Sequence, residues 1–139
     1  MSPDSRGLRA AWRDDDRGAV TTQLVLVVPV LMLMVLLIVQ FAVAWHAQHI
    51  AQSAAARALA AARVEKGGAG AGQERARQTI AALGGRILLS PQVQVRRTAT
   101  EASVRVEGRV MAVVPGLNLR VSGTAHGPVE RFVLPGQAR

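Results

Sequence analysis

Cysteine and tyrosine are absent from this 139-residue chain, and tryptophan and phenylalanine occur only twice each. Without cysteine the chain forms no disulfide bond and offers no thiolate to a metal ion. The scarcity of aromatic side chains leaves little to stack against nucleic-acid bases, although the formal net charge is +8. The composition therefore predicts no nucleic-acid partner.

Acidic residues are also scarce. No aspartate follows Asp16, and the acidic residues beyond it are scattered glutamates. A Ser-His-Asp arrangement therefore lacks its acid, and no pair of carboxylates suggests acid–base catalysis. His46 and His49 share a helix face at i,i+3 spacing, but no third ligand accompanies them, which favours polar residues at a membrane interface over a metal site. We expect neither an enzyme nor a bound metal or cofactor.

No charged side chain occurs between Gly18 and Ala56, and the first part of this stretch is strongly apolar. A bilayer core of ~30 Å requires about 20 apolar residues in a helix, and Val20 to Ala44 is a stretch of 25 residues, most of them apolar. The pattern predicts a transmembrane helix over residues 19–44. A cleaved secretory signal is the main alternative, since Ala42-Val43-Ala44 resembles a cleavage site. Secretory signals, however, have an apolar core of only about 7–15 residues, which is shorter than the run in this chain. A buried soluble helix is disfavoured because both faces are apolar.

The arginines near the span predict its orientation. Arg6, Arg9, Arg13 and Arg17 lie close to its N-terminal end, whereas the nearest arginine on the other side is Arg57. Positive charge close to a span favours the cytoplasmic side. We expect residues 1–18 to be a charged cytoplasmic leader and the C-terminal part to lie outside the cytoplasm, in a single-pass protein of the cell membrane.

Beyond the span, an alanine-rich stretch predicts that the helix continues over residues 45–64. Its alanines form two rows with helical i,i+4 spacing: Ala47, Ala51 and Ala55 in one, and Ala54, Ala58 and Ala62 in the other. Small residues in rows allow a neighbouring helix to approach closely, so we expect a packing surface. The alternative is a solvated alanine-rich helix without a partner.

A glycine-rich segment follows, and we expect residues 65–72 to form a flexible linker. The segment lacks the spacing of a phosphate-binding loop. Gln73 to Leu83 then predicts a short amphipathic helix with Ala76, Ile80 and Leu83 on its apolar face, and Gly84-Gly85 is expected to end it.

The rest of the chain alternates between apolar and polar residues, the period of β-strands. We expect strands around Val93–Val95, over Val104–Val114, over Leu117–Ser122 and in the final run 129–134, with a type II turn at Pro115-Gly116. A small antiparallel sheet with one dry face follows, covered by the short helix.

The predicted fold is therefore membrane-anchored α+β: a long N-terminal transmembrane helix that continues outside the membrane, then a short helix and a small antiparallel sheet. Residues 73–134 would form the extracytoplasmic domain and residues 135–139 a tail.

The N-terminal half resembles the type IV pilin superfamily, and most closely the TadE-like pseudopilins of the tight-adherence, or Flp-type, system. The resemblance rests on Arg17-Gly18 before the span, the early Val28-Pro29, the Ala/Arg-rich Ala54–Ala58 segment and the valine-rich Val104–Val121 region. It covers about residues 13 to 125.

The resemblance implies processing by a prepilin peptidase between Gly18 and Ala19. Family members commonly carry a glutamate five residues after the cleaved glycine, which neutralises the new N-terminal ammonium. The present chain carries Gln23 there, which accepts a hydrogen bond but supplies no opposite charge.

The resemblance thus predicts a minor pseudopilin, a structural component of a tight-adherence pilus or related secretion system. Its expected partners are the lipid bilayer, other pilin-like or secretion-system membrane proteins, and a prepilin peptidase. The alternative is a single-pass envelope protein whose exported domain binds a cell-wall or secretion partner without a pilus role. A membrane-anchored enzyme is disfavoured by the missing acid–base groups.

Overall fold

The computed structural model describes residues 6–64 and 67–129, with side chains from residue 23 onward. Helix α1 (Arg6–Arg63) includes Pro29 and continues through the predicted span and the alanine-rich stretch. The chain divides into two compact units, and the division falls between Ile38 and Val39, within α1. The predicted continuation of the apolar helix through the alanine-rich stretch is confirmed.

The N-terminal unit exposes large apolar side chains. Leu26 is 68 % exposed, Met32 63 % and Ile38 64 %. Within α1, the stretch Gln23–Arg63 is long and apolar enough to cross a membrane, by length and composition. A core helix of a soluble protein would bury such residues, so this exposure argues against that alternative.

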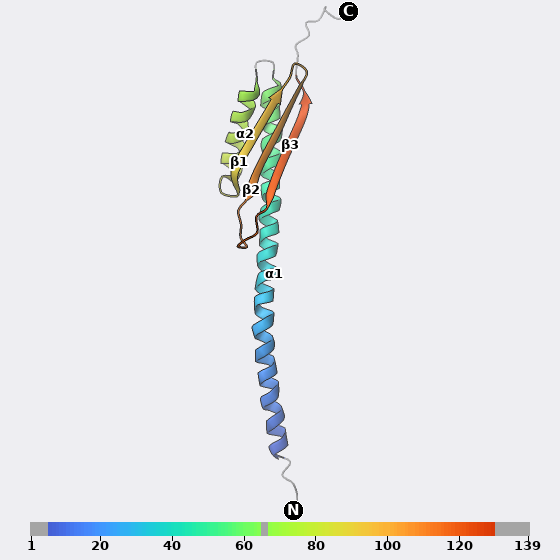
Figure 1. Ribbon diagram of the computed structural model, residues 1–139, viewed down its shortest axis with the longest axis vertical. Coiled ribbons are helices and arrows are strands. Elements are labelled where there is room, and N and C mark those ends of the chain that lie inside the picture. Colours follow the sequence, from blue (N-terminus) through green and yellow to red (C-terminus); the bar gives the residue numbers. More distant parts are fainter. Residues whose placement is uncertain (1–5, 65–66, 130–139) are drawn as a thin grey trace, which may run out of the picture. The chain divides into compact units, whose positions relative to one another are not determined.

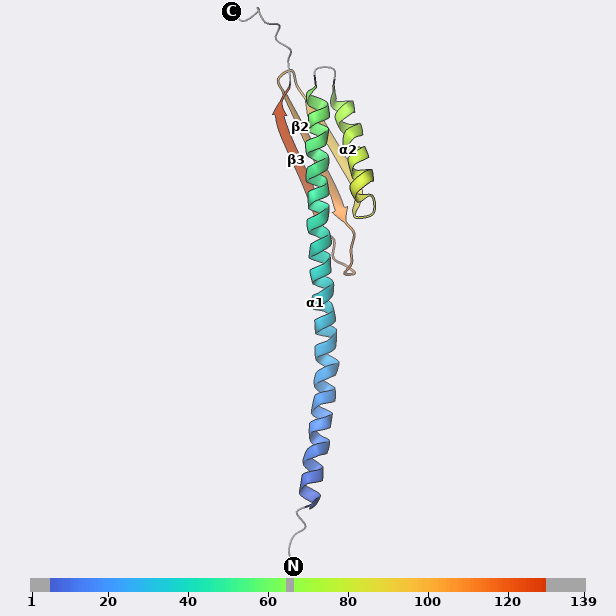
Figure 2. The same ribbon diagram turned by 180° about the vertical axis from the view of Figure 1, so that it is seen from behind.

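The C-terminal unit is an antiparallel sheet covered by helices on one face. Strands β1 (Leu88–Arg97), β2 (Glu101–Val110) and β3 (Arg120–Pro128) form a meander in that order. Helix α2 (Ala69–Gly84) and the C-terminal part of α1 lie on the same face of the sheet (Figures 1 and 2). The predicted α+β fold is confirmed, and both helices cover the sheet rather than the short one alone.

Alternation along β2 produces the dry face that the sequence predicts. Ala102, Val104, Val106 and Val110 are buried, whereas the residues between them are mostly exposed. Gly108 is also buried on the dry face. A side chain would not fit there, because a Cβ atom would lie only 2.5 Å from Leu88 Cδ1. The core is therefore built from small and β-branched side chains that pack at close range.

The predicted linker is wrong in its second half, because α2 begins at Ala69 instead of near Gln73. Gly72 lies inside the helix, where a Cβ atom would be 3.1 Å from Ala58 O and 3.1 Å from Ala62 Cβ. The absent side chain thus permits close helix packing, which outweighs the poor helix propensity of glycine. Gly85 follows the end of α2, so the predicted helix stop is confirmed.

The predicted apolar face of α2 is partly wrong. Ala76 and Ile80 are buried as expected, but Leu83 is 46 % exposed. Thr79 is buried in the helix face instead, and its Oγ1 donates a hydrogen bond to Arg75 O at 2.9 Å. This bond satisfies the hydroxyl, which allows a polar residue to lie in an apolar contact.

The predicted strands around Pro115-Gly116 are too long. Residues 111–119 form a loop between β2 and β3 instead of extending both strands. The turn itself is confirmed, since Gly116 has a φ of 86° and Leu117 N donates to Val114 O at 3.2 Å. Val129 follows β3 outside any strand, and the remainder of the predicted final strand lies outside the described residues.

The domain division also differs from the sequence prediction. The helix extension 45–64 and the domain 73–134 belong to one compact unit that begins at Val39. The alanine rows explain this difference, because they are part of the same core as the sheet.

Candidate functional site

All six alanines of the predicted packing rows are fully buried in the C-terminal unit: Ala47, Ala51, Ala54, Ala55, Ala58 and Ala62 each have 0 % exposure. The sheet and α2 of the same chain therefore cover the alanine rows, which the sequence predicts to pack against a neighbouring helix. The small side chains of the rows indicate that another segment packs closely against this part of α1. That neighbour is supplied by the same polypeptide.

The closest approach lies between α1 and β3. A Cβ atom on Gly123 would lie 2.3 Å from the backbone carbonyl carbon and oxygen of Ala51, so only glycine fits there. Gln48 Nε2 donates a hydrogen bond to Ser122 O at 2.8 Å beside this contact. The helix backbone and the strand backbone are thus in direct contact, which fixes the position of the sheet on this part of α1.

Gln40 is the polar residue that the sequence analysis missed. Its side chain is fully buried in the C-terminal unit. Its Oε1 accepts hydrogen bonds from Val113 N at 2.6 Å and Val114 N at 3.1 Å, and its Nε2 is 3.3 Å from Met111 O. One side chain thereby satisfies two donors and one acceptor of the β2–β3 loop, residues 111–119.

A glutamine inside an apolar run was the available signal for this site. An amide near the end of a long apolar segment requires hydrogen-bond partners, because an unsatisfied polar group is costly in an apolar environment. The partners of Gln40 lie more than 70 residues away along the chain, so sequence spacing does not identify them.

The predicted processing junction lies inside α1, since both Gly18 and Ala19 have helical backbone. Their side chains lie outside the described part of the structure. Gln23 is exposed in the N-terminal unit, on the same helix. The peptidase site and the role of Gln23 remain predictions.

The three histidines lie on two elements, His46 and His49 in α1 and His126 in β3. The Trp45 and His49 rings meet edge to face, with their centroids 5.4 Å apart, and Trp45 is 71 % exposed. Among the described residues, no group of three or more His, Asp or Glu side chains could hold a metal ion.

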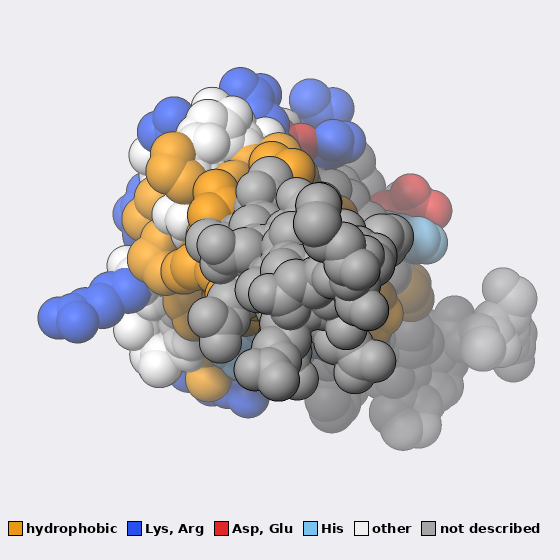
Figure 3. Space-filling view, turned by 90° about the horizontal axis from the view of Figure 1, so that it is seen from below, with side chains coloured by type: hydrophobic (Ala, Val, Ile, Leu, Met, Phe, Trp, Pro, Cys, Tyr) orange, Lys and Arg blue, Asp and Glu red, His pale blue; other side chains and the backbone are white. Residues whose placement is uncertain are grey.

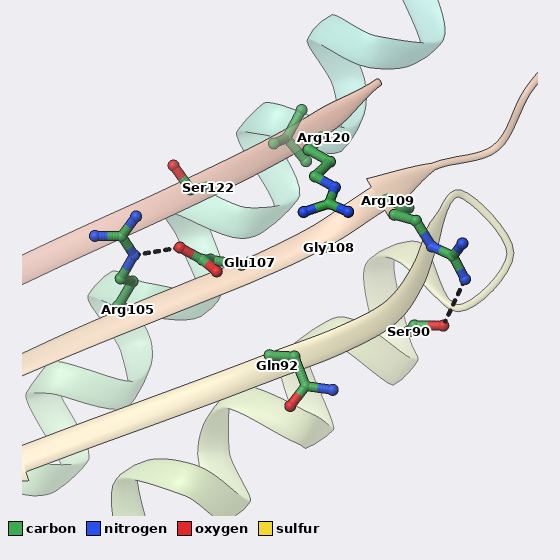
Figure 4. Close-up of a pocket in the computed structure, with 9 residues that line it drawn as sticks. Ser90, Gln92, Arg105, Glu107, Gly108, Arg109, Arg120 and Ser122 are labelled. Atoms are coloured by element: carbon green, nitrogen blue, oxygen red, sulfur yellow. Dashed lines mark hydrogen bonds and ion pairs between the residues drawn. The ribbon is translucent and has the colours of Figure 1, made fainter. Parts of the chain in front are cut away.

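The outer face of the sheet carries a hollow of about 510 Å³ lined by strand residues (Figure 4). Arg105, Arg109 and Arg120 line it together with Glu107. The Arg105 guanidinium pairs with the Glu107 carboxylate, and Arg109 Nη2 lies 3.4 Å from Ser90 Oγ. The hollow is therefore rich in hydrogen-bond donors, with one carboxylate already paired.

Arg109 and Arg120 are direct cross-strand partners in the β2–β3 register. Like charges directly opposite each other in a sheet are unfavourable. This pair lies immediately before and after the uncharged segment 110–119. The hollow thus has a basic edge beside the β2–β3 loop.

Comparison with known protein families finds a match within α1. The model of a family described as "TadE-like protein" matches residues 18–60. Over this segment the chain is similar to that family. The match begins at Gly18 and includes most of the alanine rows, so it confirms the predicted resemblance for that part of the chain. No curated protein and no solved structure matches the chain.

Proposed function

We propose that the protein is a minor pseudopilin of the TadE-like kind, a structural component of a tight-adherence pilus or related secretion system. The observation that carries the proposal is the family match over residues 18–60, which begins at the Gly18 of the predicted junction. The exposed apolar side chains of α1 support a membrane anchor. The role is structural, and its partners are the bilayer and other pilin-like or secretion-system membrane proteins.

In this proposal, prepilin peptidase cleaves between Gly18 and Ala19, and the N-terminus faces the cytoplasm. The arginines of the leader support this orientation. The C-terminal unit then lies outside the cytoplasm, where its sheet is available to other envelope proteins. The buried alanine face leaves the exposed apolar part of α1, residues 24–38, for contacts with lipid and with other membrane helices.

Mass spectrometry of the membrane-extracted protein tests the processing step. Co-expression with a prepilin peptidase should yield a chain that begins at Ala19, and Gly18→Phe should keep Met1 at its N-terminus. Gly7→Phe is a matched control in the leader and should leave cleavage unchanged. An intact N-terminus in the unsubstituted protein would contradict processing and favour the single-pass envelope protein without a pilus role.

A further inference from the structure

The β2–β3 loop differs from the other hairpin connection of the sheet. No residue from Val110 to Leu119 is charged, and all but Gly116 and Asn118 are apolar. The connection between β1 and β2 contains Thr98, Ala99 and Thr100. In an antiparallel meander these two connections lie at opposite ends of the sheet (Figure 1).

Apolar side chains of the β2–β3 loop are exposed. Met111 is 39 % exposed, and Ala112 and Pro115 are exposed as well. Figure 3, seen from below in the orientation of Figure 1, shows hydrophobic side chains in orange and Lys and Arg side chains in blue towards the outline of the molecule. Exposed apolar segments with a basic border are typical of surfaces that contact membranes.

The Gln40 hydrogen bonds fix the level of the loop along α1. Gln40 precedes the exposed Trp45 by five residues, which corresponds to about 7 Å along a helix. Tryptophan favours the interface between lipid and water. Gln40, and with it the loop backbone at Val113 and Val114, would therefore lie on the lipid side of that interface.

Several backbone amides of the loop and its base have hydrogen-bond partners within the protein. Val113 N and Val114 N donate to Gln40, and Met111 N donates to Ile87 O at 3.0 Å. Val110 N donates to Leu119 O at 2.8 Å and closes the base of the loop. Irregular backbone is tolerated at membrane depth only where protein groups satisfy it.

We propose that the β2–β3 loop enters the outer part of the leaflet through which α1 leaves the membrane, with Arg109 and Arg120 at the level of anionic headgroups. The loop supplies apolar contact with acyl chains. Arg109 and Arg120 are cross-strand partners in the β2–β3 register, and lipid phosphates offset the unfavourable pairing of like charges. The inference rests on the membrane anchor of the proposed function, and it adds a second lipid contact, from the sheet.

Single-cysteine labelling tests this contact cleanly, because the chain contains no cysteine. Full-length Ala112→Cys and the matched Ala99→Cys are labelled with an environment-sensitive fluorophore and reconstituted into vesicles of phosphatidylcholine and phosphatidylglycerol that contain spin-labelled lipids. Quenching at position 112 should exceed that at position 99 by at least about threefold, as expected for a group at the headgroup–acyl boundary. Asn118→Cys repeats the measurement at a second exposed loop position.

Val35→Cys separates failure of this proposal from failure of the anchor. Strong quenching at position 35 with water-like signals at 112 and 118 would overturn the loop contact and leave the membrane anchor intact. Absence of quenching at position 35 would overturn both.

The double variant Arg109→Gln/Arg120→Gln tests the headgroup contact. Quenching at position 112 should exceed its level in pure phosphatidylcholine when phosphatidylglycerol is present, and this gain should disappear in the double variant. Equal quenching in both lipids before substitution would overturn the role of the arginine pair.

Discussion

The two parts of α1 differ in the size of their apolar side chains. Residues 24–38 are mainly large Val, Leu, Met and Ile, and most of their surface is exposed. The six row alanines, between residues 47 and 62, are smaller, yet they are fully buried. Small side chains allow other backbone segments to come close, whereas large ones covering every face suit a lipid environment. Side-chain size therefore distinguishes the part of the helix that packs on protein from the part expected to meet lipid.

The largest expected effect comes from filling the closest contact of the packed part. Gly123→Ala places a Cβ atom 2.3 Å from Ala51 backbone, and it should destabilise the C-terminal unit by about 3 kcal/mol or more because backbone must move. Gly70→Ala is the matched control, since no neighbouring atom lies within 4 Å of its Cβ position, and at this exposed site in the first turn of α2 it should change stability by less than about 0.5 kcal/mol. Chemical denaturation followed by circular dichroism measures both. Equal stability of the two variants would contradict the close packing of β3 on α1.

Loss of the Gln40 side chain should have the next largest effect. Gln40→Ala leaves Val113 N, Val114 N and Met111 O without their partner, and an unsatisfied buried group costs about 1–3 kcal/mol. Gln52→Ala, at an exposed position of the same helix, is the control and should change stability by less than about 0.5 kcal/mol. Hydrogen exchange at the amides of Val113 and Val114 should accelerate only in Gln40→Ala. Unchanged protection there would show that Gln40 does not hold the loop.

Enlarging one alanine tests the packed face itself. Ala54→Leu inserts three carbon atoms into a fully buried position and should destabilise the unit by about 1–3 kcal/mol. Ala56→Leu, at an exposed position two residues away, should remain within about 0.5 kcal/mol. Thermal unfolding in detergent compares the pair. If Ala54→Leu were as stable as Ala56→Leu, the alanine rows would not be a packing surface.

The smallest effect is expected on the outer face of the sheet. Arg105 and Glu107 are paired, but their side chains are 57 % and 43 % exposed. Exposed ion pairs contribute about 0–1 kcal/mol, so Glu107→Gln should lower stability by less than about 1 kcal/mol in the same denaturation experiment. A larger loss would show that the pair stabilises the sheet more than its exposure suggests.

The sequence was sufficient for features set by local pattern. The long apolar helix, the dry face of β2, the stop at Gly85 and the turn at Gly116 each follow from residue spacing or backbone preference. Features that depend on distant contacts were not predictable. Gly72 belongs to a helix because Ala58 and Ala62 pack against it, although a glycine-rich segment ordinarily indicates a linker.

The candidate site shows the same limit. The small size of the alanine side chains predicts that the rows are buried against a neighbour. It does not predict that this neighbour is the sheet of the same chain. The sequence predicts strands on both sides of Pro115-Gly116, yet the hydrogen bonds of Gln40 hold Val113 and Val114 outside the ladder. Alternation alone cannot separate a strand from such a loop.

A cysteine scan along α1 in the isolated, bilayer-reconstituted chain tests the division of the helix most directly. Nitroxide labels from residue 24 to residue 62 report collisions with oxygen, which concentrates in lipid. Accessibility should be uniformly high over residues 24–38 and should then follow a helical period with minima at Ala47, Ala51, Ala54, Ala58 and Ala62. A helical period that already runs through residues 24–38, or its absence beyond residue 47, would contradict it.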